Sequence, residues 1–119
     1  MGRGQKDLER LLDLDGFLAE VGGGFWVKIV AQPVIPDVNR PHGVRYSLTL
    51  HDPRGHRVLG MDNAHLTRLT RGPAGRSSAA RDHLHRGGSV RRYVYRGAER
   101  LLEDFWREVE AILEKAGVE

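Results

Sequence analysis

The stretch GVRYSLTLHDPRGHRVLGMD, residues 43–62, contains two strand-like segments joined by a tight turn. In residues 43–51 apolar and polar side chains alternate, which is the pattern of a strand with one buried face. The DPRG sequence at 52–55 has Asp, Pro and Gly at positions where each favours a type I turn. Residues 56–62 then return as a second strand, so the stretch predicts a β-hairpin.

The register of this hairpin follows if its strands pair symmetrically about the turn. The predicted opposite pairs are Leu48 with Leu59, Tyr46 with Met61 and Arg45 with Asp62. The first two pairs would form an apolar patch on one face of the hairpin, and the third would lie on the other face. A slip of one residue would exchange the two faces.

The C-terminal segment has the clearest helical pattern in the chain. Apolar side chains recur there at steps of three and four residues, at Ala98, Leu101, Leu102, Phe105, Val109, Ile112, Leu113 and Ala116. This spacing predicts a long helix over 98–116 with one apolar stripe. We expect Trp106, which flanks the stripe, to pack against the sheet.

The remaining segments complete an α+β domain. Residues 25–34 are rich in β-branched and aromatic side chains and predict a strand, and a helix is expected near 5–13. Shorter strands are expected near 17–21 and at 90–95. The predicted fold is a small antiparallel β-sheet of about four strands, packed against the long C-terminal helix, with a short N-terminal helix. Residues 64–81, rich in Gly, Ser and Arg, predict a mobile basic loop.

The composition indicates a single globular domain that spans residues 1–119. Hydrophobic side chains make up 39% of the sequence and charged side chains 29%, which is ordinary for such a domain. No apolar run approaches the roughly 20 residues that a membrane-spanning helix needs, and no signal segment opens the chain. The absence of cysteine excludes disulfides and thiolate metal sites. We therefore expect a cytoplasmic protein without a membrane partner.

Charge is distributed unevenly along the chain. Residues 1–39 carry a net charge of −2 and residues 97–119 a net charge of −4. Residues 40–96 contain 12 arginines, all six histidines and three acidic side chains, which gives a net charge of +9. This asymmetry predicts an anionic partner for the middle of the chain, with nucleic acid as the first choice. A coding bias or heat adaptation would explain the preference for Arg over Lys, but not the scarcity of acidic residues there.

Histidines and carboxylates cluster in two short motifs. MDNAH contains Asp62 and His65, and RDHLHR contains Asp82, His83 and His85. If the second motif is extended, His83 and His85 point to the same side. Three interpretations are open. The imidazoles transfer protons near neutral pH, or His65, His83 and His85 bind a divalent metal, or the histidines are structural or surface residues.

Arginines near these motifs suit phosphate contacts, which position a nucleic acid without reading its sequence. The candidate nucleic-acid-binding residues are Arg45, Arg68, Arg71, Arg76, Arg81, Arg86, Arg91 and Arg92. Of these, Arg45, Arg81 and Arg86 are the expected phosphate clamps.

These residue types together suit a metal-free cleavage of RNA, for which no cofactor is expected. His83 or His65 would act as the general base and His85 as the general acid. Asp62 or Asp82 would orient an imidazole through its second nitrogen, while the arginines stabilise the charge that develops on the phosphate.

Four segments of the sequence resemble the TumE-like toxin family of bacterial toxin–antitoxin modules. They are GGGFWVKIVAQPV (22–34), RPHGVRYSLTLHDPRGHRVLGMDNAH (40–65), DHLHR (82–86) and RLLEDFWREVEAIL (100–113). The resemblance runs over roughly residues 22–115 and implies a growth-inhibiting protein with a cognate antitoxin, typically of the helix-turn-helix type. The similar plan of RelE-like ribonuclease toxins implies RNA cleavage by analogy of fold. The family supplies no established catalytic residues to carry over.

These observations predict a toxin whose partners are an antitoxin and RNA, and which cleaves RNA without a metal. One alternative is a non-enzymatic basic module that binds RNA or an acidic protein. The other is a metal-binding protein built on the histidines. The exposed edge of a small sheet would also permit a homodimer.

Overall fold

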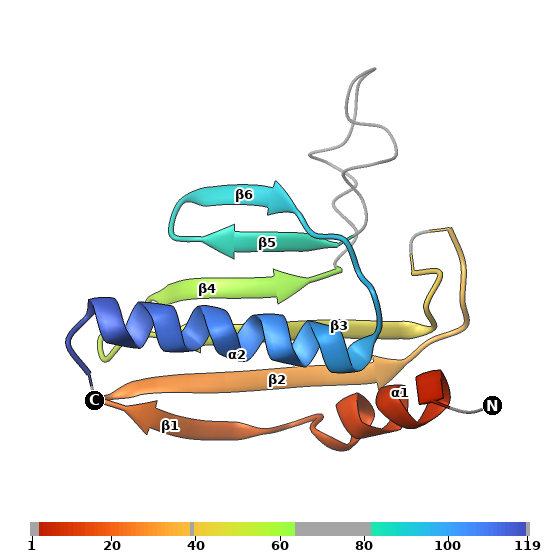
Figure 1. Cartoon of the computed structure of the whole chain (residues 1–119), viewed down its shortest axis with the longest axis horizontal. Helices are drawn as coiled ribbons and strands as arrows, with labels where there is room; N and C mark the ends of the chain where they lie inside the picture. The colour runs from red at the N-terminus through yellow and green to blue at the C-terminus, as the bar shows by residue number, and fades with distance from the viewer. Residues whose placement is uncertain (1–2, 39, 64–81, 119) are drawn as a thin grey trace.

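The computed structural model describes residues 3–38, 40–63 and 82–118, with side chains from residue 6 onward. Within these residues the chain forms two helices and six strands (Figure 1). In chain order they are α1 (Arg3–Asp13), β1 (Leu18–Gly22), β2 (Phe25–Pro33), β3 (Val44–His51), β4 (Arg57–Asp62), β5 (His83–Arg86), β6 (Ser89–Arg92) and α2 (Ala98–Lys115). The predicted α+β class is confirmed. The loop predicted at 64–81 lies outside the described residues.

All six strands belong to one antiparallel sheet, in which each strand pairs with its neighbour in sequence. The count exceeds the predicted four: the strand expected near 17–21 forms as β1, and residues 83–86 form the further strand β5. The strand predicted at 90–95 ends at Arg92 instead. There the backbone N–H of Tyr93 donates to the carbonyl of Asp82, and the chain leaves the sheet toward α2.

The helix α2 lies across one face of the sheet, as Figure 1 shows. We call this the core face, and the opposite side the outer face. The predicted apolar stripe is confirmed, since Ala98, Leu101, Phe105 and Val109 are buried. They meet the buried apolar side chains of the central strands, among them Val27, Ile29, Val44, Leu48, Leu50, Leu59 and Met61. Neither described helix has the length and apolar composition needed to cross a membrane.

The β3–β4 pairing differs from the predicted register by two residues. The observed opposite pairs are Leu48 with Met61, Leu50 with Leu59 and Ser47 with Asp62. The predicted pairs Leu48 with Leu59, Tyr46 with Met61 and Arg45 with Asp62 are therefore wrong. A shift of two residues keeps these six side chains on their predicted faces, because strand side chains alternate with a period of two.

Two extra residues account for this shift. The hairpin closes between Asp52 and His56 rather than at Gly55, through a hydrogen bond of 2.9 Å from the Asp52 N–H to the His56 carbonyl. Gly55 has a φ of +89°, a left-handed conformation that suits a three-residue hairpin loop with a glycine bulge. A second irregularity leaves Val58 without an opposite residue, because His51 pairs with Arg57 and Leu50 with Leu59.

We expect Phe105→Ala to lower the free energy of unfolding by about 3–5 kcal/mol, because the Phe105 ring is fully buried between α2 and the sheet. Denaturant unfolding measures this loss. The matched control is Glu103→Ala, an exposed change on the same helix that should alter the free energy by no more than about 0.5 kcal/mol. Equal losses in the two variants would contradict the packing of α2 on the core face.

Candidate functional site

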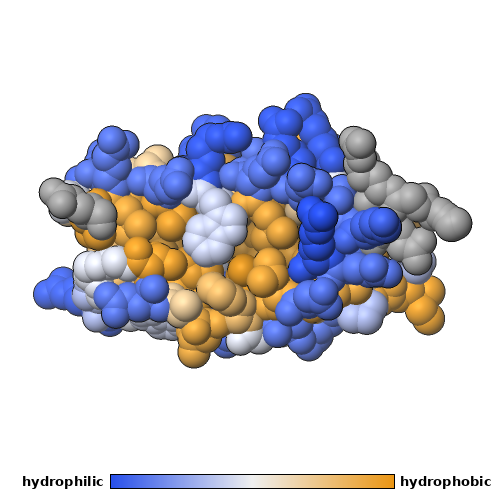
Figure 2. Space-filling model, turned by 60° about the horizontal axis from the view of Figure 1, so that its bottom comes forward, coloured by the Kyte–Doolittle hydropathy of each residue, from blue (hydrophilic) through white to orange (hydrophobic). Residues whose placement is uncertain are grey.

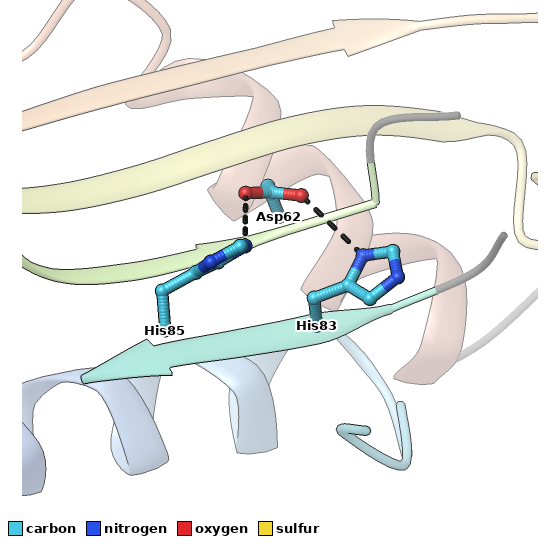
Figure 3. Close-up of side chains that lie close together, drawn as sticks. All are labelled: Asp62, His83 and His85. Atoms are coloured by element: carbon cyan, nitrogen blue, oxygen red, sulfur yellow. Dashed lines mark ion pairs between the residues drawn. The ribbon is translucent and has the colours of Figure 1, made fainter. Parts of the chain in front are cut away.

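Strands β4 and β5 bring a carboxylate and two imidazoles together on the outer face. Asp62 lies opposite His83 in the ladder, and His85 lies opposite Gly60. Since His83 and His85 are two residues apart on one strand, both side chains point to the same side. Figure 3 shows the Asp62 carboxylate between the two rings. We call Asp62, His83 and His85 the histidine–aspartate cluster.

Each oxygen of the Asp62 carboxylate faces one ring. Asp62 Oδ2 lies 3.3 Å from His85 Nε2, and Asp62 Oδ1 lies 3.6 Å from His83 Nδ1. The side chains are 13%, 15% and 5% exposed for Asp62, His85 and His83 respectively. A charged or polar group buried to this degree needs partners, and the Asp62 carboxylate supplies a hydrogen-bond partner to His85 and a longer contact to His83.

The burial of His85 favours its neutral form. Burial, with the neighbouring charges of Arg57 and His83, holds the pKa of His85 below its ordinary value, although Asp62 acts in the opposite direction. Arg57 comes close because Gly60 has no side chain. A Cβ at that position would lie 3.3–3.4 Å from the Arg57 guanidinium and Cδ. A neutral imidazole is the form that can accept a proton or bind a metal.

A pocket of about 210 Å³ opens beside the cluster. It is lined by Val30, Arg40, Arg45, Tyr46, Ser47 and Asp62. Arg45 is exposed and donates a hydrogen bond of 2.6 Å to Gln32 Oε1. The Nε of Arg40 is buried and makes no hydrogen bond within the described part of the chain. The pocket therefore offers cationic donors to an anionic group next to the cluster.

Asn63 anchors the end of β4 from which Asp62 projects. Its side chain is buried, its Oδ1 accepts the N–H of Tyr46 at 3.0 Å, and its Nδ2 donates to the carbonyl of Val44 at 2.7 Å. The amide thus continues the β3–β4 hydrogen bonding one residue beyond the last ladder pair. This contact fixes the backbone immediately after Asp62.

Asp82 takes a different environment from that of its neighbour His83. Its carboxylate accepts a hydrogen bond of 2.6 Å from the hydroxyl of Tyr46, whose ring belongs to the buried core. Burial and the adjacent Asp82 charge raise the pKa of Tyr46 above its ordinary value, so the hydroxyl stays protonated and donates. Asp82 thus joins β5 to β3 through Tyr46. Of the two aspartates proposed to orient an imidazole, Asp62 is the one that lies between the rings.

The candidate arginines are divided among several places. Arg45 lines the pocket, and Arg92 is exposed on the outer face opposite His83. Arg86 instead turns to α2, where it forms a bidentate ion pair with Glu108. Arg91 is exposed and pairs with Leu84 of the core-face row. Predicted residues that lie outside the described part of the chain are His65, Arg68, Arg71, Arg76 and Arg81.

Three residues near the cluster were not predicted from sequence: Arg40, Arg57 and Ser47. Ser47 lies opposite Asp62 only in the observed register. Arg57 reaches His85 because the bulge at Val58 changes which side chains follow the outer face, and a bulge of this kind has no clear sequence signal. Arg40 comes from the segment between β2 and β3, whose path alternation does not predict.

The same cluster has the donor set of a divalent metal site. One ligand atom from each of Asp62, His83 and His85 lies within 4.8 Å of the other two. In a tetrahedral site with bonds of roughly 2.0–2.1 Å, ligand atoms are about 3.3 Å apart. The contacts of 3.3 Å and 3.6 Å are made by the two different oxygens of Asp62, so an ion held by a single Asp62 oxygen would need the side chains to adjust. Two imidazoles and one carboxylate suit zinc or a similar transition metal.

Comparison with known proteins points to one family. A family model described as toxin TumE matches residues 28–113, which is most of the chain. No curated protein and no solved structure matches the sequence. The matched span contains β3, β4 and β5 and therefore all three residues of the cluster.

We expect Tyr46→Phe to lower the free energy of unfolding by about 1–3 kcal/mol, because it removes a short buried hydrogen bond to the Asp82 carboxylate. Tyr93→Phe is the matched control. This control removes a similar hydrogen bond to Asp104, but Asp104 keeps Arg100 and Arg107 as partners. Its loss of unfolding free energy should therefore be smaller than that of Tyr46→Phe. Denaturant unfolding measures both, and an equal or larger loss in the control would contradict the anchoring role of Tyr46.

Proposed function

Because the chain belongs to the TumE toxin family, we propose that it inhibits growth by binding RNA and cleaving it at the histidine–aspartate cluster. The observation that supports this proposal is the position of the Asp62 carboxylate between two imidazoles, beside a pocket that Arg40 and Arg45 line. Proton-transfer groups next to phosphate-binding cations are what metal-free cleavage of a phosphodiester requires.

In the proposed reaction the two imidazoles divide the proton transfers. One takes the proton of a ribose 2′-hydroxyl, and the oxygen forms a bond to the adjacent phosphorus. The other, protonated, gives its proton to the 5′-oxygen as the bond from that oxygen to phosphorus breaks. The products are a 2′,3′-cyclic phosphate and a 5′-hydroxyl end. The Asp62 carboxylate stabilises whichever imidazole carries a proton.

The environment of each ring assigns the roles. His85 has a lowered pKa, next to Arg57, and is the better general base. His83 faces Asp62 through Nδ1 and takes the role of general acid. This assignment reverses the roles expected from the sequence, where His85 was the acid. Asp82 acts as a positioning residue for β5 through Tyr46.

The phosphate contacts come from the outer face. Arg40 and Arg45 line the pocket, and Arg57 and Arg92 border the cluster on either side. Arg86 has no part in this set because its guanidinium is held by Glu108. The same arginines would serve a toxin that binds RNA without cleaving it, which is the non-enzymatic alternative.

A divalent metal at the cluster is a second candidate, favoured by the donor set of two imidazoles and one carboxylate, from each of which one ligand atom lies within 4.8 Å of the other two. A bound metal would supply an activated water and a Lewis acid. The two chemistries exclude each other at any one moment, because a metal occupies the imidazole lone pairs that proton transfer uses.

We expect His85→Ala to abolish growth arrest on induced expression and to slow RNA cleavage by at least about 100-fold, because it removes a proton-transfer group. The matched control is His56→Ala, an exposed histidine in the β3–β4 turn, which should stay fully toxic. The measurements are growth, total RNA on a gel and thermal unfolding of both purified proteins. Equal arrest by the two variants would contradict the catalytic role, and arrest without RNA fragments would favour the binding module.

We expect cleavage by untagged protein to survive dialysis against a chelator, because the proposed reaction needs no metal. Metal content by mass spectrometry accompanies the assay. Loss of cleavage on chelation, with recovery on adding zinc or manganese to wild type but not to Asp62→Asn, would establish the metal candidate instead.

A further inference from the structure

A second surface lies away from the cluster, between the first strand and the last helix. A pocket of about 550 Å³ is lined there by Val21, Trp106, Val109, Glu110, Leu113, Glu114 and Val118. We call it the β1–α2 groove. Figure 2 shows apolar surface running along this side of the molecule between two polar margins.

The groove exists because β1 is the edge of the sheet and no further described strand covers the side of α2 that faces it. Trp106 and Leu113 remain only partly buried although they pack against the core. The ring of Trp106 meets that of Phe17 edge-on, with centroids 6.5 Å apart, which holds it in place. Apolar surface gathered in a groove of this kind marks an interaction site.

The shape of the groove suits a helix. Trp106 and Leu113 are seven residues apart, about two helical turns, and so form a partly exposed ridge along one side of α2, while Val109, which also lines the groove, is buried. Ridges of this kind pack into the grooves between side chains of a second helix. An amphipathic helix with apolar residues at the same spacing would cover the ridge.

The charge at the groove is acidic and is not neutralised by the chain itself. Elsewhere on α2, Glu108 pairs with Arg86, and Asp104 pairs with Arg100 and Arg107. Glu110 and Glu114 are exposed, and neither forms an ion pair with any residue that the structure describes. Their carboxylates are available to basic side chains of a partner.

We propose that the β1–α2 groove binds a helix of the antitoxin that presents an apolar face flanked by Lys or Arg. The inference rests on membership of the toxin family, which implies an antitoxin partner, but not on RNA cleavage. The groove is formed by α2 and the sheet edge, whereas the histidine–aspartate cluster projects from the outer face. The two sites are therefore separate surfaces of the molecule.

The test measures binding of the cognate full-length antitoxin by calorimetry, with the toxin carrying His85→Ala so that it can be produced. We expect Glu110→Arg with Glu114→Arg to weaken binding by at least roughly tenfold at low salt. The matched control is Glu99→Arg with Glu103→Arg, two exposed residues with the same spacing on the same helix, outside the groove. The control should bind within about twofold of the parent, and thermal unfolding checks that all three proteins are folded.

Equal affinity of the two double variants would overturn the proposal, as would an antitoxin that fails to bind the parent protein. Light scattering of the toxin alone tests whether a second copy of this chain occupies the groove. A dimer that the Glu110 and Glu114 changes dissociate would assign the groove to a second copy of this chain. The binding experiment contains no RNA, so a failure of the groove proposal is distinct from a failure of the cleavage proposal.

Discussion

The pairing of β4 with β5 is the constraint on which both faces of the molecule depend. It places Asp62 opposite His83 on the outer face and Met61 opposite Leu84 on the core face. Side chains alternate along a strand, so a slip of one residue would turn the imidazoles to the core face and Leu84 to the outer face. Burial of apolar side chains under α2 therefore enforces the geometry of the cluster, although α2 contributes no residue to it.

Buried polar contacts make this pairing specific. Strand β5 returns to the sheet after a connection of 20 residues, so local turn geometry cannot set its register. Tyr46 does so instead, because its hydroxyl binds Asp82 just before β5. The Asn63 amide binds β3 just after β4 and so holds β4 to β3. In a different register of β4 or β5, the Tyr46 hydroxyl or the Asn63 amide would be buried without its hydrogen-bond partner, which would lower the free energy of unfolding. Two polar contacts thus align both strands that carry the cluster.

Alternation and helical periodicity were sufficient to predict the faces of the sheet and the extent of α2. They also placed His83 and His85 on one side of a strand, which the structure confirms. The same rule implies that Asp82, adjacent to His83, points the other way, and it separates Asp82 from Asp62. The register of the hairpin was predicted wrongly, because the loop closes at His56 rather than at Gly55 and the bulge at Val58 adds one further residue. The Arg86–Glu108 pair joins residues 22 positions apart and has no local signal at all.

The uneven charge of the sequence acquires a spatial meaning in this fold. The described part of the basic middle forms β3 to β6 and places Arg45, Arg57 and Arg92 on the outer face near the cluster. The acidic C-terminal segment forms α2 on the other side of the sheet. One Arg–Glu pair links the two layers, at Arg86 and Glu108. An anionic ligand and a basic partner would then be drawn to different faces of one small domain, because charges of opposite sign are separated by the thickness of the sheet.

An antitoxin bound in the groove would lie away from the cluster, and two routes would let it neutralise the toxin from there. It could change the β4–β5 pairing, or it could cover the outer face with another of its segments. The first route is disfavoured by the buried contacts of Tyr46 and Asn63, which hold β4 and β5 to β3. Steric coverage by a second segment is therefore the mechanism that this architecture favours.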